Sequence, residues 1–193
     1  KDTLTAMGIT SENVAEDFQV TRPDQDAFAY RSQMRAKAAQ DSGFFAREIA
    51  PVEIVGRKGT VTVDRDEHPR GDTTLEGLAK LKAPFRKQGG TVTAGNASGV
   101  NDGAAVLVIA SEEGVKRHGL TPRARILGYA TAGVAPRVMG IGPVSAVRRL
   151  TERFKLKIGD FDVVELNEAF AAQALAVLRQ LELSDDAAHV NPN

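Results

Sequence analysis

The chain has 193 residues, of which 42% are hydrophobic, so it can bury the core of one sizeable domain or of parts of two. Its 25 Lys and Arg balance 25 Asp and Glu, which argues against nucleic acid or an anionic membrane as the main partner. No Cys is present, which excludes disulfides, thiolate metal sites and a Cys nucleophile within these residues. Without a membrane-length apolar run or a signal-peptide pattern, we expect a cytoplasmic protein.

The first part of the chain is polar and rich in helix signals. Residues 21–24, Thr-Arg-Pro-Asp, predict a capping-box helix start, and Gly43 is a suitable residue just beyond its end. Weak strand patterns follow at residues 52–55 and 60–63, and Thr74 is placed to cap a further short helix. Element types alternate here without the rhythm of a parallel sheet, which favours an inserted lid.

The middle of the chain changes character. Residues 95–103 are almost all Gly, Ala, Asn and Ser, and they lead into the continuously apolar run 104–110, which predicts a strand covered on both faces. A flexible surface loop is one interpretation of the small residues. Close approach of a ligand to the backbone is the other, with the Ser98 hydroxyl and neighbouring amides as hydrogen-bonding groups. Ser111 then predicts the cap of another helix.

Strands and helices alternate in the second half, which predicts an α/β layered sheet. The pattern of residues 125–130 indicates a strand, and Pro143 suits the first turn of a helix. The lone Gly-x-Gly at residues 140–142 does not follow a strand with the spacing of a dinucleotide fingerprint, so we reject a nucleotide fold. The three His residues lack metal-ligand spacing, so no metal is expected.

Asn167 stands at the junction between two patterns. Residues 161–164 form a short apolar run that predicts a buried strand, and apolar residues then recur at helical spacing. One interpretation of Asn167 is a helix N-cap. The other is a functional amide, because the carboxyl edge of such a sheet is where ligands usually bind.

Several stretches together resemble the thiolase family, the coenzyme A-dependent enzymes that make or cleave 3-ketoacyl-CoA. The similarity covers nearly the whole chain. Within the family, the chain most resembles the subgroup that acts on 3-oxoadipyl-CoA in aromatic-compound degradation. The matching stretches, in chain order, are Met-Gly-Ile-Thr-Ser-Glu-Asn at 7–13, Thr-Val-Thr-Ala-Gly-Asn-Ala-Ser-Gly at 91–99, Met-Gly-Ile-Gly-Pro at 139–143 and Asn-Glu-Ala-Phe-Ala-Ala-Gln at 167–173.

The resemblance implies a role for each matching residue. Asn167 would hold a catalytic water in an oxyanion hole, a donor oriented before the thioester oxygen gains charge. The other residues would contact CoA or its acyl group: Ser98, Ala94 and Ala97 along the pantetheine arm, Met139 and Phe170 in the acyl and pantetheine pocket, Arg70 near the adenine end, and Met7 beside the pantetheine tunnel. CoA and acyl-CoA are then substrates, with no further cofactor.

The resemblance also implies an architecture of layered α/β/α sheets with an inserted helix-rich loop domain, here incomplete. Residues 1–88 would be the loop (lid) domain, 89–120 the end of the N-terminal α/β half, and 121–193 the start of the C-terminal half. Thiolases use a Cys nucleophile activated by a His, and neither segment is recognisable here. We therefore expect an internal piece of a thiolase, inactive alone, whose full-length form is a homodimer or homotetramer.

Two other hypotheses fit parts of the sequence. One is a non-catalytic CoA-binding or assembly module with a thiolase fold. The other is a different enzyme on this fold, such as a condensing enzyme. The stretches at 91–99 and 167–173 favour a biosynthetic or degradative thiolase over the latter.

Overall fold

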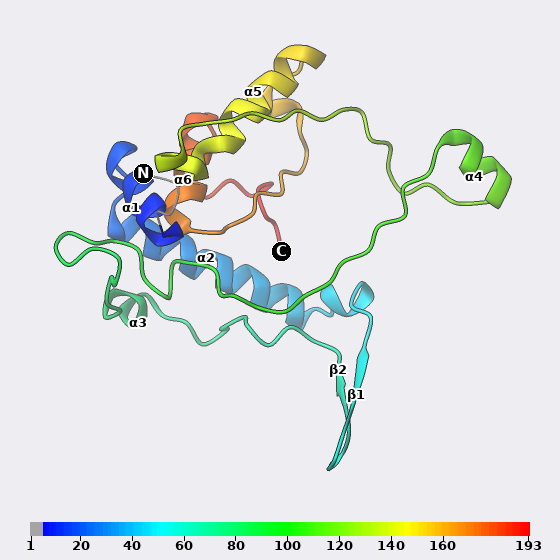
Figure 1. The fold of residues 1–193 in the computed structure, drawn as a ribbon, viewed down its shortest axis with the longest axis horizontal. Coiled ribbons are helices and arrows are strands. Elements are labelled where there is room, and N and C mark those ends of the chain that lie inside the picture. Colours follow the sequence, from blue (N-terminus) through cyan, green and yellow to red (C-terminus); the bar gives the residue numbers. More distant parts are fainter. Residues whose placement is uncertain (1–5) are drawn as a thin grey trace.

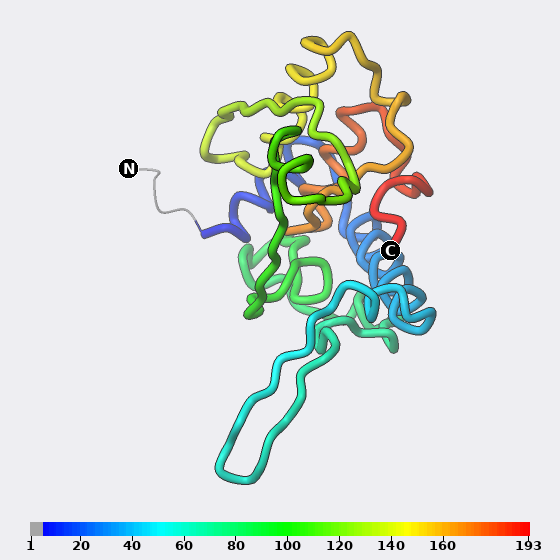
Figure 2. Tube along the Cα trace, turned by 90° about the vertical axis from the view of Figure 1, so that its right-hand side faces the viewer, coloured from blue at the N-terminus to red at the C-terminus, as the bar shows by residue number. Residues whose placement is uncertain are grey.

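The computed structural model describes residues 6–193, which fold into a helical body with a projecting hairpin (Figures 1 and 2). The elements are α1 (Met7–Asp17), α2 (Arg22–Asp41), η1 (Phe45–Arg47), β1 (Val52–Gly56), β2 (Gly59–Val63), α3 (Leu75–Ala79), α4 (Glu112–His118), η2 (Pro136–Ile141), α5 (Gly142–Phe154), η3 (Ile158–Asp160) and α6 (Ala171–Gln180). β1 and β2 pair antiparallel, from Val52 opposite Val63 to Gly56 opposite Gly59.

Helix α6 lies at the centre of the core. Its side chains are mainly small, so α1, α2 and η2 can pack closely around it. Leu175 and Leu178 are each 1% exposed. They share the core with apolar residues from α1, α2, η2, α5 and the C-terminal segment: Val14, Phe28, Ile141, Val144 and Val190.

Local capping signals give the predicted helix starts. Thr21 accepts a hydrogen bond from the Asp24 amide and donates its own amide to the Asp24 carboxylate, so the predicted capping box is confirmed. Gly43 adopts φ +71°, as expected just beyond the end of α2. Thr74 and Ser111 cap α3 and α4 in the same way, each accepting from the amide three residues on.

The strands predicted at residues 104–110 and 125–130 are wrong for the described part of the chain. Both segments are extended but unpaired, and Figure 1 shows them reaching away from the body to α4. Among residues 6–193 the sole sheet is the β1–β2 hairpin. A strand satisfies its backbone through a neighbour, and none lies beside these segments within the described residues. Leu107 is consequently 86% exposed rather than buried.

The expected layering is likewise absent from residues 161–170. Val164 makes one isolated parallel bridge, to Val190, instead of belonging to a buried strand. Helix α6 begins at Ala171 with Phe170 in the N-cap position, so the interpretation of Asn167 as a helix cap is wrong. The reason is long-range: Ala171 donates its amide to the Asn96 carbonyl, which fixes the helix start further along.

Candidate functional site

The two stretches most similar to thiolase motifs meet in space. Ala97 and Phe170 form an antiparallel bridge. Beside it the Ser98 amide donates to the Ala169 carbonyl at 3.0 Å, and the Ala171 amide donates to the Asn96 carbonyl at 2.9 Å. The structure therefore brings Ala97, Ser98 and Phe170 together, close along the chain to Asn167, whose side chain is exposed.

A buried carboxylate on α1 holds the start of the Ser98 loop. Glu12 is 1% exposed, and its oxygens accept from the Thr91 amide at 2.9 and 3.0 Å, the Thr91 hydroxyl at 2.9 Å and the Val92 amide at 2.9 Å. Hydrogen bonds to a charged acceptor are about twice as strong as neutral ones. The backbone at Thr91 is therefore tied firmly to α1.

Asn96 fixes the next part of the loop. Its Oδ1 accepts from the Thr93 amide at 2.7 Å, and its Nδ2 donates to Asp26 Oδ1 and to the Thr91 carbonyl, both at 3.0 Å. Asp26 is in turn paired with Arg22 Nε at 2.7 Å. Because every polar atom of the Asn96 amide has a partner, the backbone that presents Ser98 is rigid.

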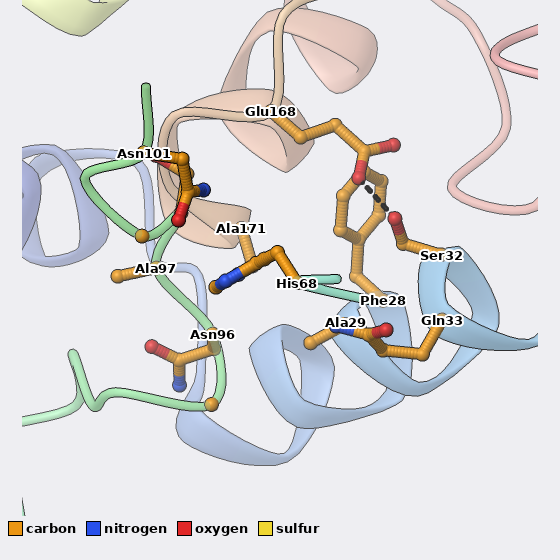
Figure 3. Close-up of a pocket in the computed structure, with 13 residues that line it drawn as sticks. Phe28, Ala29, Ser32, Gln33, His68, Asn96, Ala97, Asn101, Glu168 and Ala171 are labelled. Atoms are coloured by element: carbon orange, nitrogen blue, oxygen red, sulfur yellow. Dashed lines mark hydrogen bonds between the residues drawn. The ribbon is translucent and has the colours of Figure 1, made fainter. Parts of the chain in front are cut away.

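A pocket of about 200 Å³ lies between this loop and α2 (Figure 3). Its wall includes Ala97, Ser98 and Glu168, with Ser32 of α2 pointing toward the Glu168 carboxylate. His68 closes one side and lies so near Gly99 that an added Cβ there would be 2.5 Å from its ring. The pocket is lined by both hydrogen-bonding and apolar groups, and it is smaller than the roughly 300 Å³ at which ligand pockets usually begin.

The remaining predicted contact residues, Met7, Met139, Ala94 and Arg70, do not line this pocket. Met7 begins α1 and Met139 lies in η2, two elements that pack on each other, and both side chains are about half exposed. Ala94 is exposed beside the Ser98 loop. Arg70 follows His68 on the same connecting segment, and its amide donates to Gln33 Oε1 of α2 at 2.7 Å.

Sequence reasoning missed the contacts that apolar residues in and after α3 make with two glycines, Gly95 and Gly8. A Cβ on Gly95 would lie 2.4 Å from Leu78 Cδ2 and 2.6 Å from Leu81 Cδ1. A Cβ on Gly8 would lie 2.3 Å from the Phe85 ring. Leu81 and Phe85 are 39% and 37% exposed, so each side chain stays partly open to solvent beside the glycine that it contacts. Because the segment after α3 is not helical, no helical spacing in the sequence could have found these contacts.

The site has a cationic side formed by α2. Burial and the neighbouring Arg35 lower the pKa of Arg31, whereas Glu168, Asp186 and Asp185 oppose that shift. Arg35 donates to the Asn191 carbonyl at 3.0 Å and also to the Val190 and Ala187 carbonyls. Arg31 and Arg35 therefore tie α2 to the C-terminal segment through the Asp185 and Val190 carbonyls.

None of the helices formed by residues 6–193 combines the length and the apolar character that crossing a membrane requires. The same residues hold no cluster of three or more His, Asp or Glu side chains arranged to bind a metal ion.

The fold matches that of solved thiolase-type enzymes. The crystal structure of the Bacillus anthracis acetyl-CoA acetyltransferase superposes with a TM-score of 0.93 at 50% identity, covering 98% of this chain and 47% of that one. The fold class predicted from the sequence is thereby confirmed, although residues 6–193 hold only an incomplete version of it.

The models of the thiolase N-terminal and C-terminal domains match residues 2–113 and 120–193. The chain belongs to the thiolase family. It is 66% identical over 188 residues to the β-ketoadipyl-CoA thiolase of Pseudomonas putida, covering 97% of this chain and 47% of that protein. It is 62% identical over 189 residues to the 3-oxoadipyl-CoA/3-oxo-5,6-dehydrosuberyl-CoA thiolase of Escherichia coli K12, covering 97% and 47%. The chain thus spans about half the length of these curated relatives.

Proposed function

We propose that these residues are part of an acyl-CoA thiolase that cleaves or forms 3-ketoacyl-CoA by acyl transfer to CoA, with 3-oxoadipyl-CoA as the substrate. The observation that carries the proposal is the pairing of residues 96–98 with 169–171, which joins the CoA-contact loop to the Asn167 loop. The similarity to β-ketoadipyl-CoA thiolases supports the choice of substrate.

The residues of this chain supply only part of the catalytic groups that the reaction needs. Thiolysis of 3-oxoadipyl-CoA breaks its C2–C3 bond. The C3 acyl fragment joins the sulfur of free CoA as succinyl-CoA, and C2 gains the proton that the CoA thiol gives up and leaves as the methyl carbon of acetyl-CoA. The chain has no Cys, so the nucleophile that would carry the acyl group is not among these residues. Their part is to hold the pantetheine arm at Ser98 and to orient a donor at Asn167 toward the developing oxyanion.

The location and assembly of the complete protein belong to the same proposal. We propose a cytoplasmic homodimer or homotetramer that uses CoA and acyl-CoA as substrates and needs no further cofactor. Exposed apolar side chains in the extended segments support burial against additional protein surface, since patches of this kind mark interfaces.

The test is an assay of the complete product of the gene with 3-oxoadipyl-CoA and CoA, in which chromatography follows the two acyl-CoA products. Asn167→Ala is expected to lower kcat about 100-fold to 1,000-fold, as for loss of one oxyanion donor. Ser98→Ala is expected to raise KM for CoA several-fold, about the effect of one lost hydrogen bond. Thr62→Ala, on the exposed hairpin, is the control.

The outcomes separate the candidate functions. Turnover that depends on Asn167 supports the thiolase. CoA binding without turnover in the complete product would instead support a non-catalytic CoA-binding module. Equal turnover of the wild-type protein and Asn167→Ala would contradict the role given to that amide.

A further inference from the structure

We infer that Asn191 and Glu168 form a positioning network that sets the orientation of Asn167 and is anchored on α2. The inference rests on the proposed function of Asn167 and extends it to two residues that act through Asn167. Its basis is a set of hydrogen bonds that converge on the two neighbours of Asn167, Leu166 and Glu168.

The Asn191 side chain binds the backbone of Leu166, the residue immediately before Asn167. Its Oδ1 accepts from the Leu166 amide at 2.7 Å, and its Nδ2 donates to the Leu166 carbonyl at 2.8 Å. One side-chain amide thus satisfies both backbone groups of a single residue, as a neighbouring strand would. The Asn191 amide also donates to the Val164 carbonyl at 2.9 Å. Three hydrogen bonds from Asn191 therefore fix the path of the chain into Asn167.

Glu168 secures the other side of Asn167. Its Oε1 accepts from the second hydrogen of Asn191 Nδ2 at 2.7 Å, and its Oε2 accepts from the Ser32 hydroxyl (Figure 3). Glu168, the residue that follows Asn167, thereby links Asn191 of the C-terminal segment to Ser32 of α2. Charge-assisted bonds of this kind are strong, and both oxygens are engaged.

Helix α2 supplies the rigid base of the network. Besides Ser32, it contributes Arg35, which donates to the Asn191 carbonyl at 3.0 Å and to the Val190 carbonyl. Asn191 has φ +44°, a left-handed conformation that Asn tolerates better than most residues and that turns its amide toward Leu166.

The consequence for activity follows from orientation. An oxyanion donor acts only when it points at the position of the developing charge, and a misplacement of about 1 Å can cost about 100-fold in rate. Loss of the Asn191 side-chain amide would leave the Leu166 backbone without these two hydrogen bonds, so the Asn167 side chain would sample a wider range of orientations. Ser98 donates its amide to the Ala169 carbonyl, and Glu12 and Asn96 hold the preceding part of its loop. Because Asn191 is hydrogen-bonded to none of these three residues, CoA binding should change little.

The decisive experiment is a double-mutant cycle in the complete gene product. Asn191→Gly removes the side chain without straining the positive φ. It is expected to lower kcat about 10-fold to 100-fold with KM for CoA changed less than about twofold. In the Asn167→Ala background the same substitution should have almost no further effect on kcat, because its influence passes through the missing amide. An equal loss in both backgrounds, or a loss confined to KM, would overturn the inference.

Further variants test the network and control for folding. Glu168→Gln keeps one acceptor oxygen and is expected to lower kcat less than Glu168→Ala. Arg179→Gln removes bonds to Asp24 and Asp185 that lie outside the network, so it reports ordinary destabilisation. If Arg179→Gln lowered kcat as much as Asn191→Gly at matched stability, the positioning role would be excluded.

Hydrogen exchange separates this inference from the proposed function. In Asn191→Gly the Leu166 amide loses its acceptor, so its exchange should accelerate at least about 10-fold, whereas the Leu178 amide in α6 should be unchanged. This measurement needs no turnover. If the wild-type protein were inactive but Asn191→Gly still accelerated Leu166 exchange, the thiolase function would be rejected and the network supported. Unchanged Leu166 exchange would reject the network in an active enzyme as well.

Discussion

Helix α6 and the extended segment 104–110 are similarly apolar in sequence yet have opposite exposures. In α6, Leu175 and Leu178 are each 1% exposed, whereas Leu107 and Ile109 in the extended segment are 86% and 78% exposed. A helix satisfies its own backbone and needs only packing, but a strand needs a neighbour for its hydrogen bonds. The comparison teaches that an apolar strand pattern leads to burial only where a neighbouring strand is present, and residues 6–193 hold none beside this segment.

The overall course of the chain agrees with this view. Despite the unpaired segments, the chain superposes on a solved relative with a TM-score of 0.93 over 98% of its length. That relative is about twice as long, because this chain covers 47% of it. The extended segments thus follow a path that a longer protein also takes, with their apolar side chains open to further contacts.

The largest expected effect comes from truncating the core. Leu178→Ala should lower the free energy of unfolding by about 2–5 kcal/mol, the cost of lost burial plus a cavity. Leu107→Ala, a matched change in the extended segment, should cost less than about 0.5 kcal/mol because the side chain is already in water. Urea denaturation of the 193-residue chain measures both. Comparable losses at the two positions would mean that residues 104–110 are buried in solution.

The next effect comes from the buried carboxylate of α1. Glu12→Ala removes the shared acceptor of Thr91 and Val92 and leaves buried amides without partners, so it should cost about 2–3 kcal/mol. Glu53→Ala, on the exposed β1 strand, is the matched control and should be nearly neutral. Urea denaturation again provides the values. A neutral Glu12→Ala would show that the loop before Ser98 is held by other contacts.

Sequence-based prediction succeeded where the deciding interactions are local. Thr21, Thr74 and Ser111 cap their helices through amides three residues away, and such pairs are visible in the sequence. It failed at Asn167, because the start of α6 is set by the Asn96 carbonyl, a distant residue. The strand at 104–110 failed for a related reason, since no neighbour within residues 6–193 pairs with it.

In the candidate site, too, the residues found from the sequence differ from those that only long-range contacts reveal. Resemblance selected Ser98 and Phe170, and the structure places their loops side by side. No spacing in the sequence could show that Glu12 and Asn191 hold these loops, because each acts on a partner far along the chain. Their residue types are also common on surfaces, so only burial and hydrogen bonding distinguish them.

A smaller effect tests the contact between α1 and Phe85. Gly8→Ala would place a Cβ 2.3 Å from the Phe85 ring, whereas Gly103 has nothing within 4 Å of the same position. The clash should cost about 1–3 kcal/mol, offset by up to about 1 kcal/mol of helix propensity. We expect a net loss of about 1 kcal/mol for Gly8→Ala and almost none for Gly103→Ala. Thermal unfolding checks both, and a stabilised Gly8→Ala would show that Phe85 swings out freely.

The smallest expected effect is the loss of stability at acidic pH that comes from Asp24. Burial on its own raises the pKa of Asp24, but hydrogen bonds from Arg179 and Thr21 outweigh it and lower the pKa below its usual 3.8. A carboxylate with a lowered folded-state pKa stabilises the protein above its unfolded pKa, and this contribution disappears as pH falls through the folded value. The urea midpoint should therefore decrease from neutral pH to about pH 3, and decrease less in Arg179→Gln, which lacks the ion pair. Because Arg179 also binds Asp185, Asp24→Asn separates the two carboxylates: if Asp24 carries the effect, its acid sensitivity matches that of Arg179→Gln. Wild-type sensitivity in Asp24→Asn would assign the effect to other carboxylates of the body.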